Sequence, residues 1–69
     1  MKGDEGMSIG ENIKRRRMEA KLTQEQLAEM VNIKRPMICQ IERGTKIPSM
    51  ALGKEIADAL GCSMESLTI

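Results

Sequence analysis

The chain has 69 residues, no aromatic residue, no histidine and a formal net charge of +1, so it can form one small domain with a marginal aliphatic core. An enzyme is disfavoured, because the sequence offers no histidine base and too little volume for an enclosed pocket. No apolar run approaches the roughly 20 residues that span a bilayer, and no signal peptide is visible. We therefore expect a cytoplasmic protein without a membrane partner. Cys39 and Cys62 lack metal-ligand spacing, so we expect reduced thiols, no metal and no cofactor.

The N-terminal part of the chain predicts a tail followed by a helix. Residues 1–7 (MKGDEGM) are rich in glycine and charge, so we expect a disordered tail there and one folded domain over residues 8–69. Ser8 and Glu11 form a capping-box pattern, in which each side chain binds the other residue's backbone amide. This pattern predicts a helix over residues 9–20.

A second capping-box pattern predicts the next helix. Thr23 is followed three residues later by Gln26, and the apolar periodicity continues to Val31. The helix is therefore predicted over residues 24–31. Asn32 comes next and tolerates the left-handed backbone conformation that a sharp turn between two helices requires.

The third predicted helix covers residues 35–43 and ends at Gly44, a residue that commonly terminates helices. Two short helices joined by a tight turn form a helix-turn-helix, whose second helix fits the major groove of DNA. Pro36 is acceptable in the first turn, because the amide hydrogen that it lacks would have no partner there. Pro36 also restricts Arg35 to extended backbone angles, so we expect Arg35 to be the N-cap residue.

Two further helices are predicted in the C-terminal third of the chain. Ser49 caps a helix over residues 50–60 that stops at Gly61, and Ser63 caps a last turn over residues 64–67. The first of these helices has four apolar residues on one face: Leu52, Ile56, Ala59 and Leu60. Since no alternation typical of strands occurs in the sequence, the predicted fold is all-α with five helices.

Positive charge concentrates around the third predicted helix. Residues 1–33 carry six basic and six acidic groups, which sum to zero. Residues 34–46 carry four basic groups and one acidic group, a balance of +3, whereas residues 47–69 carry one basic and three acidic groups, a balance of −2. This placement suits contact with a phosphate backbone.

These motifs together resemble the phage repressor/Cro-like (XRE-type) helix-turn-helix family. The resemblance rests on TQEQLA, the V-x-I turn, I-x-x-IERG and the PS that follows, and it extends from about Ile9 to Leu67. It implies a repressor-like DNA-binding domain of five helices. Two positions differ from the family pattern: Asn32 replaces the usual glycine, and Pro36 stands where many relatives have a polar base-reading residue.

The resemblance also implies an ion pair inside the domain, between Arg17 and the Glu42 of IERG. Helical periodicity places Arg17 near the apolar face of the first predicted helix, one turn beyond Ile13. A guanidinium holds a carboxylate with two parallel hydrogen bonds, which suits a pair shielded from water. Arg16 lies still nearer the centre of that face, so we expect its aliphatic stem to lie along the core.

The start of the third predicted helix is the candidate base-reading site. Lys34 and Arg35 stand where the helix dipole is already positive, which an external anion or the acceptor edge of guanine would explain. A tolerated surface cluster is the alternative. By resemblance, Arg35, Pro36 and Gln40 match the family's base-reading positions, suited to guanine, a thymine methyl group and adenine. Met37 either faces the groove or covers the turn.

Contacts with the phosphate backbone are predicted on both sides of this helix. Thr23 and Gln24 stand at the start of the second predicted helix, and the resemblance implies a phosphate contact for Gln24. Arg43, Thr45 and Lys46 flank the end of the third. Such contacts fix the position of a protein on DNA without reading its sequence.

A homodimer is expected, in solution or only on DNA. One copy offers too few contacts for tight specific binding, whereas two copies related by a two-fold axis read a palindrome with half-sites about 10 base pairs apart. The predicted dimer contact consists of Met64, Leu67 and Ile69, apolar residues that a five-helix domain cannot all bury. Alternatively, Met64 and Leu67 cover the monomer's own core.

The leading functional hypothesis is sequence-specific binding of double-stranded DNA by a transcriptional repressor. The alternative is an antitoxin or adaptor that uses the same fold to hold another protein. Binding of a defined duplex by the purified chain, without a partner, separates the two. We expect no small-molecule ligand, because no segment after the last predicted helix can house a sensor domain.

Overall fold

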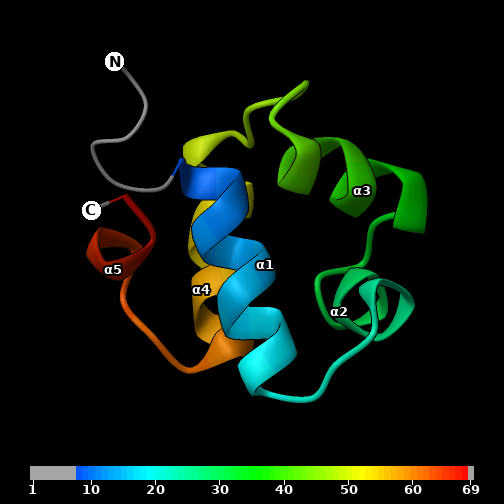
Figure 1. The fold of residues 1–69 in the computed structure, drawn as a ribbon, viewed down its shortest axis with the longest axis horizontal. Coiled ribbons are helices and arrows are strands. Elements are labelled where there is room, and N and C mark those ends of the chain that lie inside the picture. The colour runs from blue at the N-terminus through cyan, green and yellow to red at the C-terminus, as the bar shows by residue number, and fades with distance from the viewer. Residues whose placement is uncertain (1–7, 69) are drawn as a thin grey trace.

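The computed structural model describes residues 8–68, and the predicted disordered tail over residues 1–7 lies outside this range. The described residues form five helices and no strand: α1 (Ile9–Glu19), α2 (Gln24–Met30), α3 (Arg35–Arg43), α4 (Met50–Leu60) and α5 (Met64–Thr68). In Figure 1, α1 and α4 lie side by side at the centre, α5 packs on one side, and α2 and α3 lie on the other. The all-α prediction is confirmed.

Local capping explains where the first two helices begin. The Glu11 amide donates to Ser8 Oγ (3.2 Å), and the Ser8 amide donates to Glu11 Oε1 (3.0 Å). Thr23 and Gln26 exchange the same pair of bonds at 3.0 and 2.9 Å. Each box satisfies backbone donors that the first turn of a helix leaves without partners.

Two non-glycine residues have left-handed backbone angles and shape the turns. Asn32, with a φ of 60°, makes the tight turn between α2 and α3 as predicted. Lys21, with a φ of 61°, ends the turn after α1, which stops one residue earlier than expected. A lysine gives no sequence signal for this conformation, so the prediction missed it.

The core is aliphatic and forms where all five helices meet. Its members are Ile13, Leu27, Ala28, Val31, Ile38, Ile41, Ile56, Ala57 and Leu67. Helices α1 and α3 approach closely at Gly10, where an added Cβ would lie 2.1 Å from the backbone oxygen of Ile41. Asn12 is buried and donates through Nδ2 to the backbone oxygen of Leu67 (2.8 Å), which ties α5 to α1.

Arg16 differs in detail from its prediction. The residue is partly buried, and the stem lies deep enough that its Nε atom is enclosed and has no hydrogen-bond partner among the described residues. Enclosure therefore extends beyond the aliphatic stem to the first nitrogen of the guanidinium group. Within residues 8–68, each helix is too short or too polar to traverse a lipid bilayer.

Candidate nucleic-acid interface

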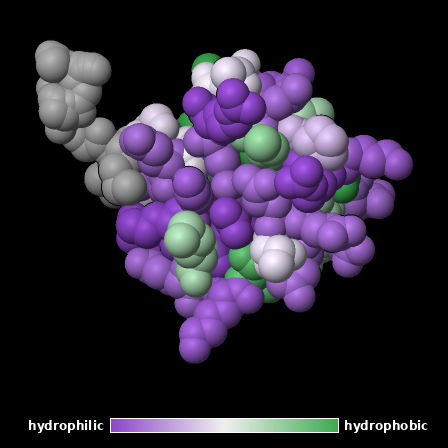
Figure 2. Space-filling view, turned by 45° about the vertical axis from the view of Figure 1, so that its right-hand side comes forward, coloured by the Kyte–Doolittle hydropathy of each residue, from purple (hydrophilic) through white to green (hydrophobic). Residues whose placement is uncertain are grey.

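Helix α3 has a buried inner face and an exposed outer face. Ile38, Ile41 and Glu42 point into the domain, where α3 packs against α1 and α2. The outer side carries five exposed residues that the sequence assigned to DNA: Lys34, Arg35, Pro36, Gln40 and Arg43. Figure 2 turns this side of the molecule forward and shows a largely hydrophilic surface with small apolar patches. The helix therefore presents polar and basic groups outward from a fixed support.

The N-terminus of α3 lacks a side-chain cap. Lys34 is the N-cap residue, with extended angles (φ −84°, ψ 149°), and its side chain makes no capping hydrogen bond. The prediction that Arg35 is the N-cap is wrong, because Arg35 is already helical. Pro36 stands in the first turn, and Arg35 is helical despite the preference of a residue before proline for extended angles. The uncapped start leaves a positive helix end next to two basic side chains.

The structure contains the ion pair that joins Arg17 to Glu42. Arg17 donates through Nε to Glu42 Oε2 (2.7 Å) and through Nη2 to Glu42 Oε1 (3.1 Å). The side chains are 11% and 2% exposed, respectively. Arg17 Nη1 also donates to the backbone oxygen of Leu22 (2.7 Å), so the pair fixes the segment between α1 and α2 as well as α3.

Gln24 links this ion pair to the outer end of α3. Its Nε2 donates to Glu42 Oε1 (3.0 Å), and its Oε1 accepts a hydrogen bond from Arg35 Nη1 (3.1 Å). Arg35 is exposed, whereas Gln24 is partly buried. Sequence reasoning assigned Gln24 to phosphate and missed both contacts, since its partners lie 18 and 11 residues away in the chain.

The other predicted contact residues surround α3. Lys46 is exposed in the loop after the helix, and Thr23 caps α2. Both donors of Thr45 bind the backbone oxygen of Gln40: the amide at 3.0 Å and the hydroxyl at 3.1 Å. Thr45 thus closes the end of α3, with its amide and its hydroxyl both bound to Gln40 in the free domain. Met37 is partly buried against the core, which favours its covering role.

Of the predicted dimer residues, Met64 and Leu67 are described by the structure, and neither is exposed. Leu67 is fully buried in the monomer core, so its assignment to a dimer contact is wrong. Met64 is partly buried and packs its side-chain end over Gly53, while Ile69 lies outside the described residues. The alternative prediction, that Met64 and Leu67 cover the monomer's own core, fits this packing, in which Leu67 also contacts α1 through Asn12.

Exposed apolar side chains lie instead around the N-terminal end of α4. Ile47 and Met50 are each 80% exposed. Met50 borders a mainly apolar groove between α4 and α5, which is lined by Met50, Ala51, Lys54, Ala57, Asp58, Cys62, Ser63 and Met64. Sequence reasoning did not single out these two residues. Their large apolar side chains, one in the short loop before α4 and one at the helix start, were the available signal.

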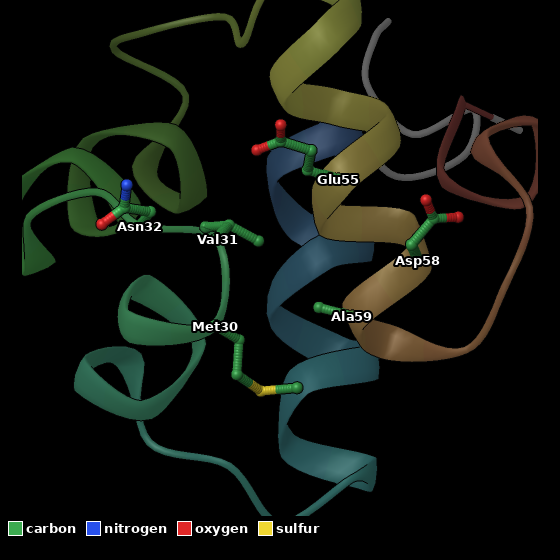
Figure 3. A pocket seen from close by; sticks show the side chains of 6 residues that line it. All are labelled: Met30, Val31, Asn32, Glu55, Asp58 and Ala59. Carbon is green, nitrogen blue, oxygen red and sulfur yellow. The ribbon is translucent and has the colours of Figure 1, made fainter.

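A second, shallow groove separates the turn after α2 from α4. Figure 3 shows its lining residues: Met30, Val31, Asn32, Glu55, Asp58 and Ala59. The carboxylates of Glu55 and Asp58 repel phosphate, although Lys54 lies 3.5 Å from Asp58 and partly balances it. This groove is therefore not part of a DNA-binding surface.

Comparison with known proteins agrees with this geometry. The Helix-turn-helix family model matches residues 13–67. The immunity repressor protein of Bacillus phage phi105 is 41% identical over 61 residues, which are 88% of this chain and 42% of that protein. Multiprotein-bridging factor 1 of Candida albicans is 38% identical over 63 residues, which are 91% of this chain and 42% of that protein. The chain thus spans less than half the length of these two relatives.

A solved structure shares the fold over nearly the whole chain. The P22 c2 repressor, determined in complex with synthetic operator 9T, has a TM-score of 0.86 and 32% sequence identity. The match covers 91% of this chain and 96% of the repressor chain. With the family model spanning most of its residues and the helix-turn-helix in place, the chain belongs to the phage repressor/Cro-like (XRE-type) helix-turn-helix family.

Proposed function

We propose that this domain binds double-stranded DNA sequence-specifically, with α3 in the major groove, and represses transcription. The observation that carries the proposal is the outer face of α3, where Arg35 and Gln40 stand exposed on a helix anchored by Ile38, Ile41 and buried Glu42. The shared fold with the P22 c2 repressor, whose structure contains operator DNA, supports this placement.

The proposed base contacts come from the first two turns of α3. The Arg35 guanidinium matches guanine O6 and N7, and the Gln40 amide matches adenine N6 and N7. Pro36 is exposed between them and offers its ring to a thymine methyl group. Lys34 adds positive charge at the uncapped helix start, where a phosphate or guanine oxygen would compensate the unfavourable dipole.

The proposed phosphate contacts lie on both sides of α3. The Thr23 hydroxyl accepts from the Gln26 amide and keeps its own hydrogen for a phosphate oxygen. Arg43 and Lys46 are exposed beyond the C-terminal end of the helix. Such contacts supply affinity that falls with salt concentration but do not discriminate between sequences.

We also propose that two copies bind one palindromic site. The exposed apolar side chains of Ile47 and Met50, together with the adjoining groove between α4 and α5, support an isologous contact in this region. The contact would leave the outer face of α3 free in both copies. A two-fold arrangement doubles the phosphate and base contacts available to one small domain.

A protein-binding role is the second candidate function. It is favoured by the similarity to multiprotein-bridging factor 1 over 91% of this chain. In that case the fold would serve mainly to hold another protein, and the outer face of α3 would carry no sequence preference. The two functions differ in whether the chain by itself enriches a defined duplex.

Selection of duplexes from a random pool by the purified full chain tests the proposal. We expect enrichment of a palindromic sequence with a guanine and an adenine at fixed positions in each half-site. A pool that remains random after repeated rounds, although the chain is folded, would contradict sequence-specific binding and favour the protein-binding role.

A further inference from the structure

We infer that the groove between α4 and α5 binds a soft monovalent metal ion, Cu(I), through the sulfur atoms of Cys62, Met64 and Met50. All three residues line this groove. Thiolate and thioether sulfur are soft ligands of the kind that Cu(I) prefers. The expectation of no metal site, drawn from the spacing of the two cysteines and the absence of histidine, did not consider methionine sulfur. The site needs only one chain and is independent of the proposed DNA binding.

Met64 brings a thioether onto the surface of α4. If Gly53 carried a Cβ atom, the Met64 Sδ atom would lie 3.3 Å from it and the terminal methyl carbon 2.6 Å from it. Gly53 is buried at this point, where α5 packs on α4. The Met64 sulfur therefore has a defined place on α4, in the turn that contains Gly53.

Cys62 and Met50 lie on either side of that sulfur along α4. The Cys62 amide donates to the backbone oxygen of Ala57 (3.0 Å), and Ala57 follows Gly53 by four residues. Met50 precedes Gly53 by three residues and begins the helix. Residues three and four apart on a helix have Cβ atoms about 5–6 Å apart and share a face. The groove thus presents the three sulfur-bearing side chains in order along one face of α4: Met50, Met64 and Cys62.

Small residues and flexible side chains allow the three sulfur atoms to converge on one ion. The α4 side of the groove includes Ala51 and Ala57, whose side chains end at Cβ. A methionine side chain has three rotatable bonds, so its sulfur changes position without movement of the backbone. Met50 is 80% exposed, which gives its side chain room to turn into the groove. Rotamer changes alone therefore bring its sulfur toward that of Met64.

The ligands of this groove suit Cu(I) better than Zn²⁺. Cys62 releases its proton on binding, so its thiolate neutralises the charge of Cu(I), and the two thioethers add no charge. A neutral site avoids the cost of charge in a mainly apolar groove. Zn²⁺ usually takes four ligands from thiolate, imidazole and carboxylate. The groove offers Zn²⁺ only Cys62 and the carboxylate of Asp58, which already lies 3.5 Å from Lys54.

The experiment measures the Cu(I) affinity of the full chain by competition with a chromogenic Cu(I) chelator in the absence of oxygen. We expect one ion per chain. Cys62→Ser removes the only charged ligand and should lower the affinity by more than the roughly 10- to 100-fold that follows loss of a residue beyond the ligands. Met64→Leu and Met50→Leu conserve side-chain volume and remove the sulfur, so each should lower it by roughly tenfold or more. Cys39→Ser is the matched control and should leave the affinity unchanged.

A second measurement locates the ion without relying on variants. Ag(I), which has the same preference for sulfur and resists oxidation, is added to the full chain at one equivalent. The methyl resonances of Met50 and Met64 should shift, while that of Met30, which is 54% exposed on α2 outside this groove, should not.

Three results would overturn the inference. The first is equal Cu(I) affinity of Cys62→Ser and the wild type, because the ion would then be bound elsewhere in the chain. The second is unchanged affinity in either Met64→Leu or Met50→Leu, which would contradict a site of three sulfur atoms. The third is an affinity for Zn²⁺ that equals or exceeds that for Cu(I), which would contradict a soft site.

Discussion

Glu42 receives three hydrogen bonds in the interior of the domain, two from Arg17 and one from Gln24. A buried carboxylate without such partners would be strongly unfavourable, so the three residues depend on one another. The family resemblance implied the pair, and periodicity placed Arg17 near the apolar face. Nothing local in the sequence pointed to Gln24 as the third member, because its partner lies on another helix.

The first prediction concerns this pair. Arg17→Met leaves the Glu42 carboxylate, only 2% exposed, without its charged partner. The loss of stability is expected to be on the order of 3–5 kcal/mol, a large part of the total for a small domain. Arg15→Met is the matched control, because Arg15 makes an exposed pair with Glu19 at 3.4 Å. Thermal melts compare the two, and similar small shifts in Tm would show that the interior pair contributes little.

A second prediction uses two glycines within helices. Replacing a helical glycine by alanine usually stabilises by about 0.5–1 kcal/mol, but at Gly10 the new Cβ would meet the Ile41 backbone at 2.1 Å. We expect Gly10→Ala to destabilise by about 1–3 kcal/mol, as overpacking does. Gly53→Ala meets only the flexible end of Met64, at 2.6 Å, and should cost less. Denaturant unfolding measures both, and an equal or smaller loss at Gly10 would contradict a rigid α1–α3 crossing.

At the scale of helices, the starts that nearby residues set were predicted correctly, whereas contacts between helices were predicted only in part. The capping boxes at Ser8 and Thr23 placed the starts of α1 and α2, since their partners lie three residues away. The predicted bounds of α3, residues 35–43, are confirmed, and only the N-cap was placed one residue too late, at Arg35 instead of Lys34. For Leu67 the sequence left a dimer contact and covering of the monomer core both open, because the choice depends on α1, to which Asn12 joins it across 55 residues.

The third prediction concerns the start of α3. Lys34 is an N-cap without a capping bond, and its charge opposes the helix dipole. Lys34→Ser supplies a cap and is expected to stabilise the free domain by about 0.5–2 kcal/mol. The same change removes a positive charge from the proposed DNA surface, so DNA affinity should fall. Melts and duplex titrations measure the two effects. A variant that gains stability and keeps full affinity would show that Lys34 has no part in DNA binding.

At the scale of the whole molecule, positive and negative charge concentrate in different segments of the chain. The segment 34–46 has a balance of +3 and includes α3, whereas the segment 47–69 has a balance of −2 and includes α4 and α5. The groove between the α2–α3 turn and α4 is lined by the carboxylates of Glu55 and Asp58, which have the same sign of charge as phosphate (Figure 3). Composition predicted this separation along the chain, but the positions of the exposed apolar residues required the fold.

The fourth prediction tests assembly. Met50→Glu places a charge beside the groove between α4 and α5 and should prevent binding of a second copy without changing the affinity for a single half-site. Met18→Glu is the control, because Met18 is also exposed, at 59%, but lies on α1. Sedimentation with a palindromic duplex should give two chains per duplex for the wild type and the control. A one-to-one complex of the wild type at saturating protein would contradict the dimer.

The reading of bases by α3 is tested most directly by titrating the wild type and Arg35→Ala against the selected duplex, its single-base variants and a random duplex. Arg35→Ala is expected to lose about 1–3 kcal/mol on the selected duplex and to relax the preference at one base position only. Lys46→Ala, as the control, should weaken all duplexes alike and lower the salt dependence by about one phosphate contact. Equal losses on the selected and random duplexes for Arg35→Ala would contradict sequence recognition through this helix.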